Sequence, residues 1–195
     1  MKKNIILIIA LVAIGVIGRL IPHPPNFTPI IAIALLASHL FKNKWIIILP
    51  SLMAMWISDL IINNYLYGGY HDSLVIFSPS FLWVYAPIIC IALLGTVLIK
   101  KVKISNIALS SISGSLIFFL VSNFGVWISG TISIDGVLTP MFSKSLSGLI
   151  ACYTVALPYF GNQLVGDLLY SATLFSSYSF ALSKKAMLKK VNNFI

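Results

Sequence analysis

Long apolar runs alternate with short polar connections along the whole chain. A helix needs about 20 mostly apolar residues to cross the hydrocarbon core of a bilayer, so each long run is a candidate membrane span. The second run is short, and we expect it to tilt or to draw its flanking residues inward. The runs cover residues 5–20, 28–41, 45–62, 81–99, 104–127 and 146–182.

The last run is too long for a single crossing. A continuous helix over residues 146–182 extends about 55 Å, whereas the hydrocarbon core is about 30 Å thick. Pro158 and Gly161 lie within the run, and both residue types interrupt helices. The pattern therefore predicts either two spans or a short interfacial or re-entrant helix followed by a span at residues 162–182.

The positions of the basic residues distinguish these alternatives. With the N-terminus in the cytoplasm, six spans put all but two of the thirteen Lys and Arg residues on the inner side, the exceptions being Arg19 and Lys144. Seven spans move the C-terminal lysines outside, against the positive-inside rule. We therefore predict one integral membrane domain, residues 1–195, that is an all-α bundle of six transmembrane helices. Both termini are inside, with the short helix before the last span.

Composition supports a membrane protein. Hydrophobic residues make up 59% of the chain and charged residues 9%, and the mean hydropathy is +1.01. A soluble domain carries about 25% charged residues. The net charge of +9 comes from lysine clusters between apolar runs, which mark topology rather than a nucleic-acid surface. Cys90 and Cys152 are far apart without ligand-type neighbours, so neither a metal site nor another cofactor is predicted.

The predicted topology gathers the polar residues other than lysine at the outer side. Arg19 is the only arginine in the chain, and Asp59 lies about one turn inside the outer end of the third span. An ionised aspartate within a span is costly unless it is paired or faces water. The candidate binding residues are Arg19, His23, Asn26, Asp59, Asn123, Trp127, Tyr153, Asn162 and Asp167.

Two interpretations of these residues stay open. Arg19, Asp59 and Asp167 could form an ion pair that holds three helices together, or they could contact a ligand, and the two roles can coexist. In the ligand interpretation, Arg19 and His23 bind an anionic or polar group, and the aspartates orient Arg19 or accept from a ligand donor. Trp127 and Tyr153 stack on a planar part of the ligand, and Asn123 and Asn162 add neutral hydrogen bonds. Asn26 and Asn123 could instead cap or cross-link helices.

The segment GRLIPHPPNFTPI, residues 18–30, joins the first two spans. Its prolines fix φ and lack a backbone donor, so they predict a stiff, non-helical hairpin. We expect Asn26 or Thr28 to cap the second helix, with Pro29 early in its first turn. A rigid hairpin that carries an arginine and a histidine is suited to shaping a ligand site.

Motifs typical of enzymes are missing from the sequence. It contains no Walker GxxxxGK[ST] loop, no HExxH and no GxSxG. We therefore do not expect an enzyme, and this chain cannot itself hydrolyse ATP by the Walker route.

Four sequence blocks resemble signature blocks of a bacterial family of membrane proteins with a proposed transport role. They are RLIPHPPNFTPI at 19–30, ISDL at 57–60, SNFGVW at 122–127 and ACYTVALPYFGNQLVGDLLY at 151–170. In size, six-helix topology and hydropathy that family is similar to the S components of energy-coupling factor (ECF) transporters.

The resemblance implies a substrate-binding subunit in the cytoplasmic membrane of a prokaryotic cell. Such a subunit captures a vitamin-like or other small nutrient near the extracytoplasmic side. Its partners would be membrane lipid, a membrane scaffold (T) subunit and a pair of cytoplasmic ATPases. S components dock through an Ala-x-x-x-Ala face of the first helix, and this chain departs from that pattern. It offers Ala10, Ala13 and Gly15 in the first run, and Ala34 and Ser38 in the second.

Two other functions are compatible with the residues. A stand-alone secondary transporter could use Asp59 and Asp167 as proton relays. A membrane enzyme at the outer leaflet could use His23, His71 and Asp72, although these lack the spacing of a nucleophile and its base.

Overall fold

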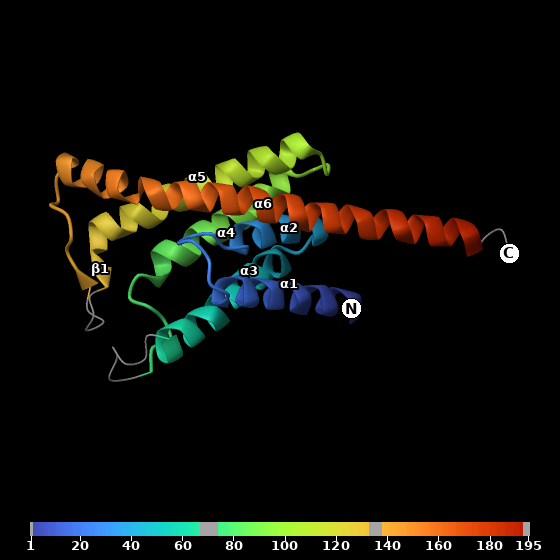
Figure 1. The fold of residues 1–195 in the computed structure, drawn as a ribbon, viewed down its shortest axis with the longest axis horizontal. Coiled ribbons are helices and arrows are strands. Elements are labelled where there is room, and N and C mark those ends of the chain that lie inside the picture. The colour runs from blue at the N-terminus through green and yellow to red at the C-terminus, as the bar shows by residue number, and fades with distance from the viewer. Residues whose placement is uncertain (1, 67–73, 133–137, 193–195) are drawn as a thin grey trace.

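The protein, described here by a computed structural model, is a bundle of six α-helices (Figure 1). The structure describes residues 2–66, 74–132 and 138–192. A short π-helical segment, η1, continues α3, and two short strands follow α5. The elements are α1 (Lys2–Leu20), α2 (Ile30–Leu40), α3 (Lys44–Ile61), η1 (Ile62–Leu66), α4 (Phe81–Leu98), α5 (Ile104–Ser129), β1 (Thr131–Ile132), β2 (Leu138–Thr139) and α6 (Leu146–Asn192).

Helix α2 forms the centre of the bundle. It packs against α3, α4, α5 and α6, and its residues from Ile30 to Ser38 are all buried. A helix that is apolar on every side is stable only where other helices surround it, and the sequence IIAIALLA meets that condition. With eleven residues, α2 extends only about 16 Å, so it is shorter than the membrane core of about 30 Å.

Small residues let the helices around the centre approach closely. A Cβ atom placed on Gly15 of α1 would lie 2.5 Å from the Cβ of Ala54 of α3. A Cβ on Gly95 of α4 would collide with Ser38 of α2, which is itself 7% exposed. Ala34 is fully buried beside it along the same helix. Gly15, Ala34 and Ser38 therefore pack inside this chain and leave no surface for a scaffold subunit.

The boundaries of four predicted spans agree with the structure to within two residues. These are α2, α3, α4 and α5, and α1 also ends where predicted, at Leu20. Among the residues that the structure describes, three helices are long and apolar enough to cross a membrane, and two shorter ones are also apolar. The long ones are Lys44–Leu66, Phe81–Leu98 and Ile104–Ser129. The chain is accordingly a helical membrane protein.

The prediction of a break in the last region is wrong. Helix α6 runs without interruption from Leu146 to Asn192, through both Pro158 and Gly161. Pro158 is exposed, so the carbonyl that loses its intrahelical partner is not enclosed by other helices. A Cβ on Gly161 would meet nothing within 4 Å, so no close contact requires a glycine there. Within residues 138–192, which the structure describes, no separate interfacial or re-entrant helix precedes the last span.

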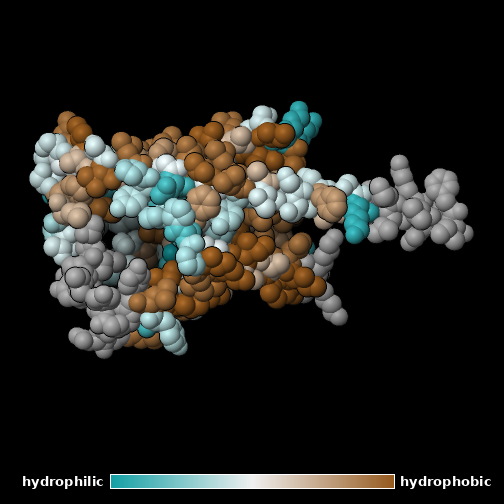
Figure 2. All heavy atoms as spheres, in the orientation of Figure 1, coloured by the Kyte–Doolittle hydropathy of each residue, from teal (hydrophilic) through white to brown (hydrophobic). Residues whose placement is uncertain are grey.

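Helix α6 extends well beyond its neighbours at its C-terminal end (Figure 1). Its 47 residues correspond to about 70 Å. Helix α1 begins and α6 ends at the same end of the bundle (Figure 1). Hydrophobic residues cover much of the visible surface, while hydrophilic residues gather at the α4–α5 turn and along part of α6 (Figure 2).

Two short strands and Lys144 lie at the C-terminal end of α5. Gly130 has φ +97° and ends the helix, and β1 pairs with β2 through Thr131 and Thr139. Lys144 donates to the backbone oxygens of Trp127 and Ile128, the second bond being 2.6 Å long. Its ammonium also lies 5.6 Å from the centre of a Trp127 ring. A cation at the negative end of a helix is stabilising, which gives this predicted outer-side lysine a structural role.

Candidate functional site

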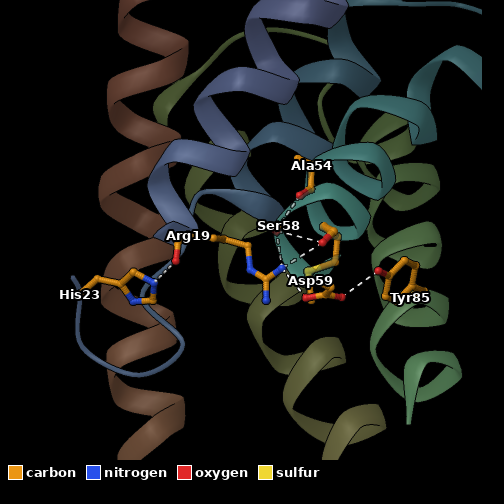
Figure 3. A network of polar contacts seen from close by, with 7 residues as sticks. Arg19, His23, Ala54, Ser58, Asp59 and Tyr85 are labelled. Carbon is orange, nitrogen blue, oxygen red and sulfur yellow. Dashed lines mark hydrogen bonds and ion pairs between the residues drawn. The ribbon is translucent and has the colours of Figure 1, made fainter. Parts of the chain in front are cut away.

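The only arginine of the chain joins α1 to α3. Arg19 lies in the last turn of α1, and its Nη1 lies 2.6 Å from Oδ1 of Asp59. The same nitrogen donates to the hydroxyl of Ser58 at 2.5 Å and to the backbone oxygen of Met55 at 3.1 Å. The side chains of Arg19 and Asp59 are 15% and 19% exposed. Figure 3 shows the guanidinium reaching from α1 to the carboxylate on α3.

A third helix completes this network. The hydroxyl of Tyr85 on α4 donates to Oδ2 of Asp59 at 2.8 Å, so each carboxylate oxygen has a donor (Figure 3). Ser58 also donates to the backbone oxygen of Ala54, four residues earlier in α3. The network therefore fixes α1, α3 and α4 relative to one another near Arg19. This agrees with the interpretation of Arg19 and Asp59 as a structural ion pair.

The second acidic residue, Asp167, belongs to a separate group on α5 and α6. It is 2% exposed, and its Oδ2 accepts from the hydroxyl of Ser115 at 2.7 Å. Gln163, one turn earlier in α6, donates to the backbone oxygen of Ser115 at 3.2 Å. Within the described residues, the salt bridge of Arg19 with Asp59 is the only one, so Asp167 has no cationic partner there. Arg19 thus bridges one predicted aspartate and not the other.

A pocket lies between the two groups. Its volume is about 80 Å³, and residues from all six helices or their connections line it. Arg19 contributes from one side and Asp167 from the other, with Asn26 and Gln163 also present. The full lining is Arg19, Asn26, Thr28, Ile30, Ile31, Met55, Ile88, Phe118, Gln163 and Asp167. The structure therefore brings three of the predicted site residues, Arg19, Asn26 and Asp167, to one hollow.

The proline-rich hairpin forms the rim of this pocket. Asn26 has φ +63°, and backbone bonds from Phe27 to Pro24 and from Thr28 to Asn26 close the turn. Asparagine tolerates this left-handed conformation better than most residues. The predicted capping role is wrong: Pro29 is the N-cap residue of α2, and no side chain caps that helix end.

His23 stays at the edge of the hairpin, outside the lining of the pocket. Its two ring nitrogens face the backbone oxygens of Pro24, at 2.8 Å, and of Arg19, at 3.3 Å. The imidazole therefore ties the hairpin to the end of α1.

Four predicted site residues lie away from the pocket. Asn123 donates to the backbone oxygen of Phe119, and Trp127 donates to that of Ser143. The hydroxyl of Tyr153 donates to the backbone oxygen of Leu120 at 2.6 Å. Asn162 also does not line the pocket, although it directly precedes Gln163. Trp127 thus connects α5 to the segment before α6, and Tyr153 connects α6 to α5.

Several residues of the site were missed by the sequence analysis. Tyr85 and Ser115 sit in apolar runs, where a single hydroxyl gives no indication of its partner. Ser115 does have one signal, since Ser111 precedes it by one helical turn and both are fully buried. Thr28 and Met55 line the pocket only because the hairpin and α3 pack together, which no local pattern predicts.

The histidine and aspartate suggested for an enzyme, His71 and Asp72, lie outside the described residues. Among the residues that the structure does describe, no group of three or more His, Cys, Asp or Glu residues could hold a metal ion.

Together the fold and the site define a helical membrane protein with a small polar pocket between its helices. The chain belongs to the family described as "family of unknown function (DUF6580)", which matches residues 1–190. No curated protein and no solved structure matches the chain. The resemblance to ECF S components therefore stays a prediction.

Proposed function

We propose that this protein is the substrate-binding membrane subunit of a small-nutrient importer. The observation that carries the proposal is the pocket lined by Arg19, Asn26, Gln163 and Asp167. Buried polar side chains inside a membrane protein are costly and mark ligand sites or pathways. Here the buried Gln163 and Asp167 and the partly buried Arg19 converge on one space, where the exposed Asn26 of the hairpin joins them.

The arrangement of the helices supports the finer features of the proposal. Helix α1 begins and α6 ends at the same end of the bundle, as six crossings with both termini in the cytoplasm require. In this topology the pocket opens toward the extracytoplasmic side of a prokaryotic cytoplasmic membrane. The absence of a Walker loop from the sequence fits a subunit that relies on a scaffold (T) subunit and a pair of cytoplasmic ATPases.

Helix α1 is the candidate face for the scaffold. Ala10 and Ala13 are exposed, together with Ile6, Ile9 and Ile17, so this apolar side of α1 is free for another membrane helix. Small residues on such a face permit close helix approach.

The pocket volume favours a nutrient smaller than a vitamin. Pockets that enclose drug-sized ligands measure about 300 to 1,000 Å³. At about 80 Å³, this pocket suits a molecule of only a few heavy atoms.

The test is mass spectrometry of small molecules that co-purify with the protein in lipid nanodiscs. Thr28 lines the pocket and is partly buried, so Thr28→Phe should fill it and abolish retention of the bound molecule. Thr173 is exposed on α6, and Thr173→Phe is the matched control, which should retain the molecule. Equal retention by both variants would refute a binding role for this pocket.

A stand-alone secondary transporter is the second candidate, and the burial of Asp167 favours it. A carboxyl group with no cationic partner among the described residues could carry a proton across the membrane. Liposomes that contain this protein alone and the pH dye pyranine would test it. Proton entry that follows addition of small molecules from culture medium, and that Asp167→Asn abolishes, would favour this function over the importer subunit.

A further inference from the structure

The two aspartates of the site differ in charge balance. Asp59 is neutralised by Arg19, and Tyr85 satisfies its second oxygen. Asp167 is less exposed and forms no ion pair within the described residues, although Arg19 lines the same pocket. The positive charge of Arg19 is already matched by Asp59, so within the described residues no cation is left to compensate Asp167 when it is ionised. A buried ion is costly unless an opposite charge lies close to it.

Arg19 retains hydrogen-bonding capacity toward the pocket. All of its polar contacts are made by Nη1, and within the described chain no acceptor bonds its Nε or Nη2. In Figure 3 no dashed line reaches the second terminal nitrogen. Since Arg19 lines the pocket, this free edge can donate to an acceptor on a bound molecule.

The other lining residues restrict the size of a bound molecule and add no charge to the pocket. Five of the ten lining residues are apolar: Ile30, Ile31, Met55, Ile88 and Phe118. The neutral polar ones, Asn26, Thr28 and Gln163, can donate or accept but add no charge. With a volume of about 80 Å³, the pocket takes a molecule whose two polar ends are only two or three bonds apart.

We propose that the pocket binds a small organic cation that carries a primary amine at one end and a hydrogen-bond acceptor at the other. The ammonium group pairs with the ionised carboxylate of Asp167, and the two charges compensate each other. The acceptor, a hydroxyl or amide oxygen, meets the free edge of Arg19. This inference rests on the proposed function, because it names the class of molecule that the same pocket takes.

A panel of size-matched probes tests the assignment by titration calorimetry on the full chain in phosphatidylcholine nanodiscs. The cationic probes are ethanolamine and glycinamide, and the comparison probes are glycine, glycolate and ethylene glycol. Probes of four or five heavy atoms bind no more tightly than about a few micromolar even at the best ligand efficiency, so the titrations extend to millimolar concentrations. We expect both cationic probes to bind at least tenfold more tightly than glycolate and ethylene glycol, with glycine between.

Three results with the same probes would overturn the proposal. Tighter binding of glycolate would mean that Arg19 dominates the pocket. Equal affinity for ethylene glycol and ethanolamine would mean that the charge of Asp167 does not contribute to ligand binding. Ethylamine lacks the acceptor, and affinity equal to that of ethanolamine would refute the contact with Arg19. The wild-type protein alone gives these results, so they do not depend on the folding of any variant.

Two variants then locate the cation. Asp167→Asn keeps the shape and removes the charge, and it should weaken ethanolamine binding at least tenfold while leaving ethylene glycol unchanged. Ser115→Ala removes the hydrogen bond to Asp167 but leaves its charge, and it should weaken ethanolamine binding no more than threefold. Similar losses in both variants would refute a charge-based role for Asp167.

Failure of this inference is distinguishable from failure of the proposed function. If the co-purifying molecule is displaced by Thr28→Phe but is an anion or a neutral compound, the importer subunit stands and the amine assignment is wrong. If amines bind but no nutrient is retained or transported, the assignment stands and the importer function is wrong.

Discussion

The ion pair between Arg19 and Asp59 predicts a specific pattern of stabilities. Its Nη1 and Oδ1 atoms lie 2.6 Å apart, and the two side chains are only 15% and 19% exposed. At an effective dielectric constant of about 20, two unit charges about 4 Å apart attract each other by about 4 kcal/mol. Desolvation of both groups offsets much of this gain, so replacing the whole pair costs less than removing one partner.

We therefore expect Arg19→Met to lower the free energy of unfolding by about 2 to 4 kcal/mol, because it leaves the Asp59 carboxylate with Tyr85 as its donor. Asp59→Asn should cost a similar amount, since it leaves an uncompensated guanidinium. The double variant should lose less than the sum of the two, with a coupling energy of about 1.5 to 3 kcal/mol.

The assay is SDS-driven unfolding in bicelles, followed by tryptophan fluorescence. Lys42→Met removes an exposed cation and is the matched control, with an expected change within about 0.5 kcal/mol. It should also be additive with Asp59→Asn. A coupling energy below about 0.5 kcal/mol between Arg19→Met and Asp59→Asn would refute the reasoning, because two independent side chains would give that result.

Three further predictions concern the packing and the helix ends. Gly15→Val should destabilise the protein by about 1 to 3 kcal/mol, because its side chain meets Ala54, whereas Ala13→Val on the exposed side of α1 should change little in the same unfolding assay. Pro158→Ala should restore a backbone hydrogen bond in α6 and slow amide exchange over the preceding turn, and unchanged exchange would show that the bond does not form. Lys144→Met should speed amide exchange in the loop that follows α5 by removing its contacts to the end of that helix, while unaltered exchange would contradict a capping role.

The sequence predicts the long helices well and their mutual contacts poorly. Helices α3 to α5 follow from apolar runs that end at lysines, prolines or a glycine, and such signals are local. The eleven residues of α2 look like a short span, yet they form the buried centre. Only the surrounding helices determine that outcome, and a hydropathy pattern does not specify them.

The candidate site shows the same division. The pairing of Arg19 with Asp59 could be anticipated, since the chain has one arginine and few aspartates to pair with it. That Asp167 would have no cationic partner within the described residues could not be anticipated. It depends on how α6 is rotated against α5, which places Ser115 opposite Asp167. Pro158 misled the analysis for a related reason: a proline interrupts hydrogen bonding but does not by itself end a helix where nothing encloses the freed carbonyl.

The unbroken course of α6 gives it the properties of a lever arm. Twenty-five residues separate Asp167 from Asn192, which is about 37 Å of a single helix. A tilt of about 10° around the carboxyl group would move the far end by about 6 Å. A shift of α6 at Asp167 would thus move the C-terminal end of the same helix, with no break in the helix between the two points.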